Sequence, residues 1–278
     1  MKTLLTLGFI ILFSFTNQAQ AIKATVKGTG DPILLLAGFA STSDVWHPLE
    51  DRFAESHELH LVDYAGFGKL PAVEMPFLDK VRNELINYVR TIDDENLVII
   101  GHSMGGTLAA WLGAQPDLKI KQIIIIDGLP ATGALMFPNV DLATLTYENP
   151  YNDQMMAMDD SAFAKAISPM AAGMAKAFEH QNAIKQDILN TDRKTYVYGY
   201  TDYLKFDVRE DLKQIDIPVT ILGAAGMFGE EMATNTYKNQ YENLKEYTFK
   251  MHPNSKHFIM YDDPSWLNAQ IVEVLKTE

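Results

Sequence analysis

The residues best suited to chemistry form one pentapeptide, Gly101-His102-Ser103-Met104-Gly105. A short apolar run from Leu97 to Ile100 precedes it, and Thr107 to Ala114 has the composition of a helix. In the pattern G-x-S-x-G, a serine on a sharp turn between a strand and a helix is held with its hydroxyl exposed. The N-terminus of the following helix favours negative charge that develops there. This context predicts that Ser103 is a nucleophile.

A serine hydroxyl is a weak nucleophile and needs a general base. The chain has seven histidines. His257 lies in the loop after the last predicted strand, on the side where the carboxyl ends of the strands meet and where open α/β sheets place their sites. We therefore expect His257 to be the general base and later the general acid. The side chain of His102 is expected to point away from Ser103.

Apolar runs and amphipathic segments alternate from Ile33 to Ile126, as expected when buried strands and covering helices follow one another. Phe77 to Ile92 has helical spacing. The predicted strands are 24–27, 33–36, 60–63, 97–100, 120–126, 218–223 and 246–250. This alternation predicts an α/β fold with a mostly parallel central sheet and helices on both faces.

Residues 129–206 interrupt the alternation because they contain no apolar strand run. Helical stretches such as 161–178 and 182–189 occur instead. Six methionines fall in this segment: Met136, Met155, Met156, Met158, Met170 and Met174. Methionine suits an adaptable apolar surface. We expect an inserted helical lid over a substrate, dividing the core into residues 22–128 and 207–278. The alternative is ordinary helix packing with methionine as core filler.

The N-terminus has the pattern of a secretory signal peptide. Lys2 supplies a positive charge, Leu4 to Phe15 is mainly apolar, and Ala19-Gln20-Ala21 matches a cleavage site. This run of twelve residues is too short to cross a membrane as a helix, which takes about 20. We expect residues 1–21 to be removed and the protein to be exported to the periplasm or the medium. N-terminal sequencing that found Met1 on the exported protein would contradict this.

Composition narrows the possible partners and chemistry. The chain has no cysteine, which excludes disulfides, a thiol nucleophile and thiolate metal ligands. Its net charge of −13 argues against nucleic acids and anionic membrane surfaces as partners. No metal-binding pattern or phosphate-binding loop is present in the sequence. We therefore expect no cofactor and no metal.

Four motifs in order resemble the α/β-hydrolase family over nearly the whole chain after residue 21. Leu34 to Phe39 is similar to the family's oxyanion loop, and Asp63 to Gly68 to its D-x-x-G-x-G turn. The Ser103 pentapeptide resembles its nucleophile elbow, and Ser255 to Phe258 its late histidine loop. The resemblance implies acyl transfer to water. It also implies an oxyanion hole made by the backbone N–H groups of Phe39 and Met104.

A catalytic triad needs a carboxylate that orients the histidine, in addition to Ser103 and His257. The sequence identifies this acidic residue less directly. The family usually carries it in a G-x-x-D turn, but here that turn reads Gly223-Ala224-Ala225-Gly226. Asp127 ends the strand after the elbow helix, where some relatives place their acid, and we prefer it. Glu230 or Glu231 could instead reach back to the histidine. The loop after residue 36 also departs from the family's usual His-Gly, because it reads Ala37-Gly38.

These observations predict an exported serine hydrolase that cleaves a carboxylic ester of a small or medium apolar substrate through an acyl-enzyme on Ser103. Its only expected partner is that small acyl substrate. An amide or lactone hydrolase would use the same machinery and remains an alternative. A non-catalytic binding protein on a hydrolase scaffold is a second alternative, because the G-x-x-D acid is missing.

Overall fold

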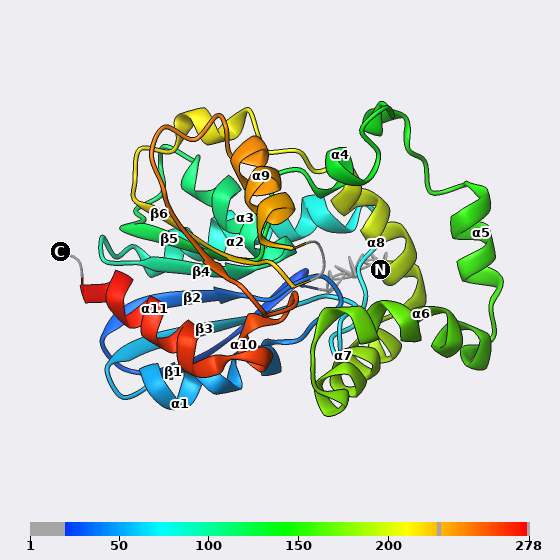
Figure 1. The fold of residues 1–278 in the computed structure, drawn as a ribbon, viewed down its shortest axis with the longest axis horizontal. Coiled ribbons are helices and arrows are strands. Elements are labelled where there is room, and N and C mark those ends of the chain that lie inside the picture. Colours follow the sequence, from blue (N-terminus) through cyan, green and yellow to red (C-terminus); the bar gives the residue numbers. More distant parts are fainter. Residues whose placement is uncertain (1–19, 227–228, 277–278) are drawn as a thin grey trace, which may run out of the picture.

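A seven-stranded sheet forms the centre of the molecule in the computed structural model, which describes residues 20–226 and 229–276 (Figure 1). The strands are β1 (Ile22–Gly28), β2 (Asp31–Leu36), β3 (His57–Tyr64), β4 (Val98–His102), β5 (Gln122–Ile126), β6 (Val219–Ala224) and β7 (Thr248–His252). Their order across the sheet is β1-β3-β2-β4-β5-β6-β7. Only β1 pairs antiparallel within this sheet, so the predicted mostly parallel sheet is confirmed.

The central strands read as continuous apolar runs because both of their faces are covered. All residues of β4 and β5 are buried. The register pairs His102 at the end of β4 with Ile126 at the end of β5, and Ile126 with Leu222 in β6. The loops after these strands therefore open at the same edge of the sheet, as the sequence predicts for the site.

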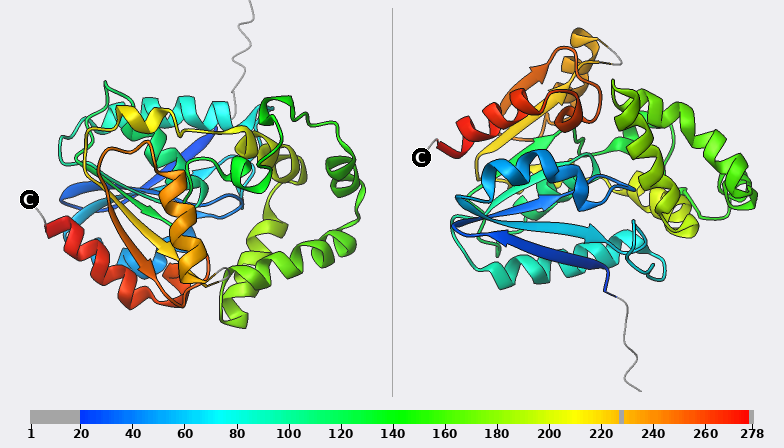
Figure 2. Two further views of the ribbon diagram at one scale, coloured as in Figure 1. Left: turned by 45° about the horizontal axis from the view of Figure 1, so that its top comes forward. Right: turned by 90° about the horizontal axis from the view of Figure 1, so that it is seen from below.

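Helices cover both faces of the sheet. The helices α1 (His47–Phe53) and α11 (Pro264–Lys276) contact each other on one face. The helices α2 (Phe77–Ile92) and α3 (Met104–Gly113) lie on the opposite face, as Figures 1 and 2 show. The short helix α10 (Ile259–Asp262) precedes α11, and α9 (Glu230–Gln240) links β6 to β7. No helix within the described residues is long and apolar enough to span a membrane.

Residues 129–206, called the inserted segment below, carry only helical elements and turns. Its α-helices are α4 (Thr132–Met136), α5 (Pro150–Ala157), α6 (Asp160–Met174), α7 (Phe178–Asn190) and α8 (Arg193–Lys205). The helix predicted for 161–178 is therefore confirmed as far as residue 174, but its predicted end is wrong. The chain is extended at Ala175, and the N–H of Lys176 donates to Asp262 of α10, so the helix breaks between α6 and α7.

The helix α8 anchors the inserted segment to the core. The carboxylate of Asp202 accepts hydrogen bonds from the backbone N–H of Phe77, at 2.7 Å, and from the hydroxyl of Tyr147, at 2.6 Å. At the other end of α8, the N–H of Asp192 donates to the carbonyl oxygen of Gly66, at 2.7 Å. The glycine-rich turn predicted at 63–68 thus serves as a docking point for this helix.

Asp187 of α7, in the inserted segment, lies near Asp44 of the core. This pair of carboxylates is electrostatically unfavourable, and it predicts that stability depends on pH. Burial, with a smaller contribution from Asp44, raises the pKa of Asp187 on α7 to about 6. An unfolded aspartate titrates near 4, so the folded state holds this proton more tightly. The contribution of protonated Asp187 to the free energy of unfolding is therefore fully present below about pH 4, and it is lost as the pH rises through about 6.

Asp187→Asn should therefore raise the free energy of unfolding relative to the wild type by about 1 kcal/mol at pH 7.5, after discounting for solvent screening, and hardly at all at pH 4. Thermal melts of both proteins at the two pH values measure this difference. The largely exposed Asp44 is the control, and Asp44→Asn should change stability by less than about 0.5 kcal/mol. An equal effect of Asp187→Asn at both pH values would contradict the prediction.

Candidate active site

Ser103 occupies the turn between β4 and α3 in a strained backbone conformation. Its φ is +53° and its ψ is −120°, a combination that non-glycine residues rarely adopt. The flanking glycines make this turn possible. A Cβ on Gly101 would lie 2.1 Å from the carbonyl oxygen of Gly105, and a Cβ on Gly105 would lie 2.0 Å from that of Leu36. The local geometry is thus that of the elbow predicted from the sequence.

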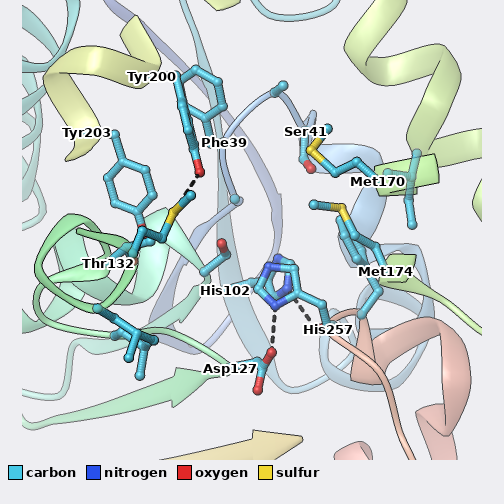
Figure 3. A pocket seen from close by; sticks show the side chains of 18 of the residues that line it. Phe39, Ser41, His102, Asp127, Thr132, Met170, Met174, Tyr200, Tyr203 and His257 are labelled. Carbon is cyan, nitrogen blue, oxygen red and sulfur yellow. Dashed lines mark hydrogen bonds and ion pairs between the residues drawn. The ribbon is translucent and has the colours of Figure 1, made fainter. Parts of the chain in front are cut away.

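The loop after β7 brings His257 onto the carboxylate of Asp127 (Figure 3). The distance between His257 Nδ1 and Asp127 Oδ2 is 2.5 Å. An ionised carboxylate can only accept, so the ring carries its proton on Nδ1, and Nε2 is free to act as a base. Asp127 follows β5 directly, with a φ of +44°, and its N–H donates to the carbonyl oxygen of Leu222.

The alternative acids do not share this position. Glu230 and Glu231 form the exposed first turn of α9. Among the described residues, neither carboxylate is hydrogen-bonded to His257, whereas Asp127 is. The usual family position for the acid is closed, because a Cβ on Gly226 would lie 2.2 Å from the carbonyl oxygen of Ser255. No side chain of any type fits at residue 226 without moving the loop that carries His257.

His102 supports the loop of His257, a role that the sequence analysis did not identify. Its buried ring lies beside the His257 ring, with the centroids 4.6 Å apart. Its Nε2 lies 3.0 Å from the carbonyl oxygen of His257 and must donate to it. Burial holds the pKa of His102 well below its usual value, so the ring stays neutral and keeps this hydrogen bond. The second position of G-x-S-x-G varies in type, so the motif alone carried no indication of this role.

The predicted oxyanion donors flank the serine. Met104 is the first residue of α3, so its N–H has no acceptor within the helix. The loop after β2 packs closely on the elbow, because a Cβ on Gly38 would lie 3.1 Å from Ser103 Cβ. Phe39, the next residue, lines the same cavity as Ser103. These positions are compatible with the donor pair predicted from the sequence.

Ser103, Asp127 and His257 open into one cavity of about 720 Å³ between the core and the inserted segment (Figure 3). Four of the six methionines of the inserted segment line it: Met136, Met155, Met170 and Met174. Met156 and Met158 instead pack against the hydrophobic core. Aromatic rings form another wall, where Phe39 lies 5.2 Å from Tyr200 between ring centroids. No lysine or arginine occurs among the described residues that line the cavity.

Within the described residues, no group of three or more histidine, cysteine, aspartate or glutamate side chains is arranged to hold an ion. Tyr196 and Tyr200 of the cavity wall remain neutral at physiological pH, because burial raises the pKa of Tyr200 to about 12 and that of Tyr196 further. The described lining of the cavity therefore presents apolar surface, neutral hydroxyl groups, the neutral ring of His102 and the hydrogen-bonded pair of His257 and Asp127.

The fold and the elbow define the α/β hydrolases, and the chain belongs to this family, whose model matches residues 33–270. It is 20% identical over 208 residues to a pimeloyl-(acyl-carrier protein) methyl ester esterase of Vibrio cholerae, covering 73% of this chain and 78% of that protein. It is 21% identical over 245 residues to 3-oxoadipate enol-lactonase 1 of Acinetobacter baylyi, covering 81% and 85%.

A solved structure shows the same fold. An esterase from Exiguobacterium antarcticum superposes with a TM-score of 0.74 at 17% identity, covering 93% of this chain and 98% of that one. The family and its esterase relatives support hydrolase activity for this chain.

Proposed function

We propose that the protein is a serine hydrolase that cleaves carboxylic esters of small or medium apolar substrates. The observation that carries this proposal is the contact between His257 Nδ1 and Asp127 Oδ2 beside an elbow serine, in an apolar cavity. Methyl ester esterases and an enol-lactonase among its relatives act on carboxylic esters, cyclic in the second case. Lactone cleavage is therefore a second candidate, because it uses the same steps.

The proposed reaction has two stages. His257 Nε2 removes the proton of Ser103 as its oxygen attacks the ester carbonyl, and the N–H groups of Phe39 and Met104 stabilise the oxyanion. The protonated His257 then gives its proton to the departing alcohol, which leaves an acyl-enzyme on Ser103. Water attacks this ester in the second stage, again with His257 as base. Asp127 holds the ring in the required tautomer throughout.

The side chains that line the cavity favour the binding of uncharged substrates. Burying an unpaired carboxylate is costly, and no lysine or arginine among the described lining residues could pair with it. We expect kcat/KM for p-nitrophenyl butyrate to exceed that for the p-nitrophenyl monoester of succinate by at least about tenfold, which corresponds to about 1.4 kcal/mol. Steady-state kinetics with both esters measure the ratio. An equal or higher value for the charged ester would contradict the assignment of substrate class.

In this proposal the inserted segment acts as a lid over the substrate. We also propose that the protein is exported and acts outside the cytoplasm. Residues 1–19 of the predicted signal peptide lie outside the described residues. Cleavage after Ala21 would leave an α-ammonium on Ile22, whose nitrogen is 3.1 Å from a carboxylate oxygen of Glu84. The new positive charge would meet a negative partner, whereas the buried Ala21, whose carbonyl oxygen accepts from the N–H of Ala65, would be removed. N-terminal sequencing of protein from the periplasm or the medium tests this cleavage.

Labelling with a fluorophosphonate tests the enzyme assignment directly, since the reagent bonds covalently to an activated serine. Intact mass and peptide mapping should find one adduct, on Ser103. His257→Ala should abolish the labelling while the protein remains folded. A folded wild-type protein that neither reacts nor hydrolyses any p-nitrophenyl ester would instead be a binding protein on a hydrolase scaffold.

A further inference from the structure

The carboxylate of Asp127 has two further donors besides His257. Both approach its other oxygen, Oδ1. The backbone N–H of Ala224, at the end of β6, donates to it at 2.8 Å. The hydroxyl of Tyr237, from α9, donates to the same oxygen in a short hydrogen bond. One carboxylate oxygen therefore faces the histidine while the other is held by two groups from neighbouring elements.

The fold makes room for Tyr237 in this position. The side chain is buried, and its ring lies 5.0 Å from that of Phe249 between centroids. A Cβ on Gly223 would lie 2.7 Å from Tyr237 Cε2, so a glycine there is needed for the ring to reach Asp127. Burial and the adjacent carboxylate raise the pKa of Tyr237 well above its usual value. The phenol therefore stays protonated and always donates.

We propose that Tyr237 is a positioning residue of the active site, which holds Asp127 so that Oδ2 meets His257 Nδ1. This inference rests on the proposed function. The usual acid position at Gly226 is closed, so the carboxylate comes from the end of β5 instead. An aspartate side chain can rotate about its last bond, and two donors on Oδ1 fix that rotation. Without the phenol, one buried lone pair is left without its donor.

Tyr241, the residue that directly follows α9, provides a matched control. Its ring is stacked on that of Tyr237, with centroids 6.5 Å apart and an interplanar angle of 12°. It is also buried, and its hydroxyl donates to the carbonyl oxygen of Gly128, at 2.8 Å. Tyr241→Phe removes the same atom from an equally buried site without touching the Asp127 carboxylate. The two variants should therefore lose similar stability.

The kinetic test compares Tyr237→Phe with Tyr241→Phe. We expect Tyr237→Phe to lower kcat by about 10- to 100-fold, the effect typical of losing an outer hydrogen-bond partner, and to leave KM within about twofold. Tyr241→Phe should leave kcat within about twofold. In the Asp127→Asn background, Tyr237→Phe should cause no further loss beyond about twofold, because it acts through that carboxylate. A kcat loss equal to that of Tyr241→Phe, or one that persists in the Asp127→Asn background, would overturn the inference.

A spectroscopic test does not depend on turnover. The proton on His257 Nδ1 gives a downfield NMR resonance while it is shared with a carboxylate. Tyr237→Phe frees the carboxylate to rotate away from the histidine ring, so this resonance should move upfield or broaden, whereas Tyr241→Phe should leave it in place. An unchanged resonance in both variants would overturn the inference even if Ser103 is the nucleophile. If Ser103 proves dispensable for hydrolysis, the proposed function fails, while the resonance still reports whether Tyr237 orients the carboxylate.

Discussion

Asp127→Asn is expected to lower kcat by about 10⁴-fold, because an asparagine amide in place of the carboxylate leaves the histidine in the wrong tautomer. The contact of 2.5 Å between Asp127 Oδ2 and His257 Nδ1 is the basis of this expectation. Steady-state kinetics with a p-nitrophenyl ester measure the loss. Glu230→Gln and Glu231→Gln are the controls and should stay within about twofold of the wild type. A loss of less than about tenfold in Asp127→Asn would exclude this residue as the acid.

The position of the acid also explains why a simple restoration of the family pattern should fail. Gly226→Asp would put a carboxyl group where the family usually has it. However, its Cβ would collide with the carbonyl oxygen of Ser255, in the loop that positions His257. Adding Gly226→Asp to Asp127→Asn should therefore recover no activity.

Ser103→Ala is expected to lower kcat by about 10⁶-fold, since loss of the nucleophile removes the whole covalent route. Alanine has a Cβ like serine, so the strained turn at φ +53° should be retained and the protein should fold. Kinetics, with circular dichroism as a check of folding, measure both properties. Ser168→Ala, which removes a hydroxyl bonded within α6, is the control and should remain active. Residual activity above about 1% in Ser103→Ala would contradict the proposed mechanism.

Local patterns were sufficient to predict the sheet and the elbow. The apolar runs of the central strands are long and uninterrupted, and the helix predicted for 77–92 has the same bounds as α2. The sequence favours Asp127 because it ends the strand after the elbow helix, where some members of the resembled family place their acid. These inferences depend on neighbours in sequence, on the alternation of strands and helices, and on the family resemblance.

Contacts between residues that are far apart in the sequence could not be predicted from local patterns. Tyr237 meets Asp127 across 110 residues, and no local pattern distinguishes it from Tyr241. The support of the His257 loop by His102 spans 155 residues. The break between α6 and α7 depends on the carboxylate of Asp262, far along the chain. Such contacts arise from packing, which a single sequence does not encode in any local spacing.

The attachment of α8 to the core has a consequence for how this scaffold can diversify. Because α8 is tied down at both ends, through Asp192 and Asp202, the wall that it contributes to the cavity keeps a constant position. The helix α5 contributes Met155 and contacts α8. The helix α6 contributes Met170, but it is joined to the loop of His257, because the N–H of Phe258 donates to the carbonyl oxygen of Met174. New substrate preferences can therefore be selected by randomising α5 alone. The variants in such libraries would keep the catalytic residues and the sequence of the core unchanged.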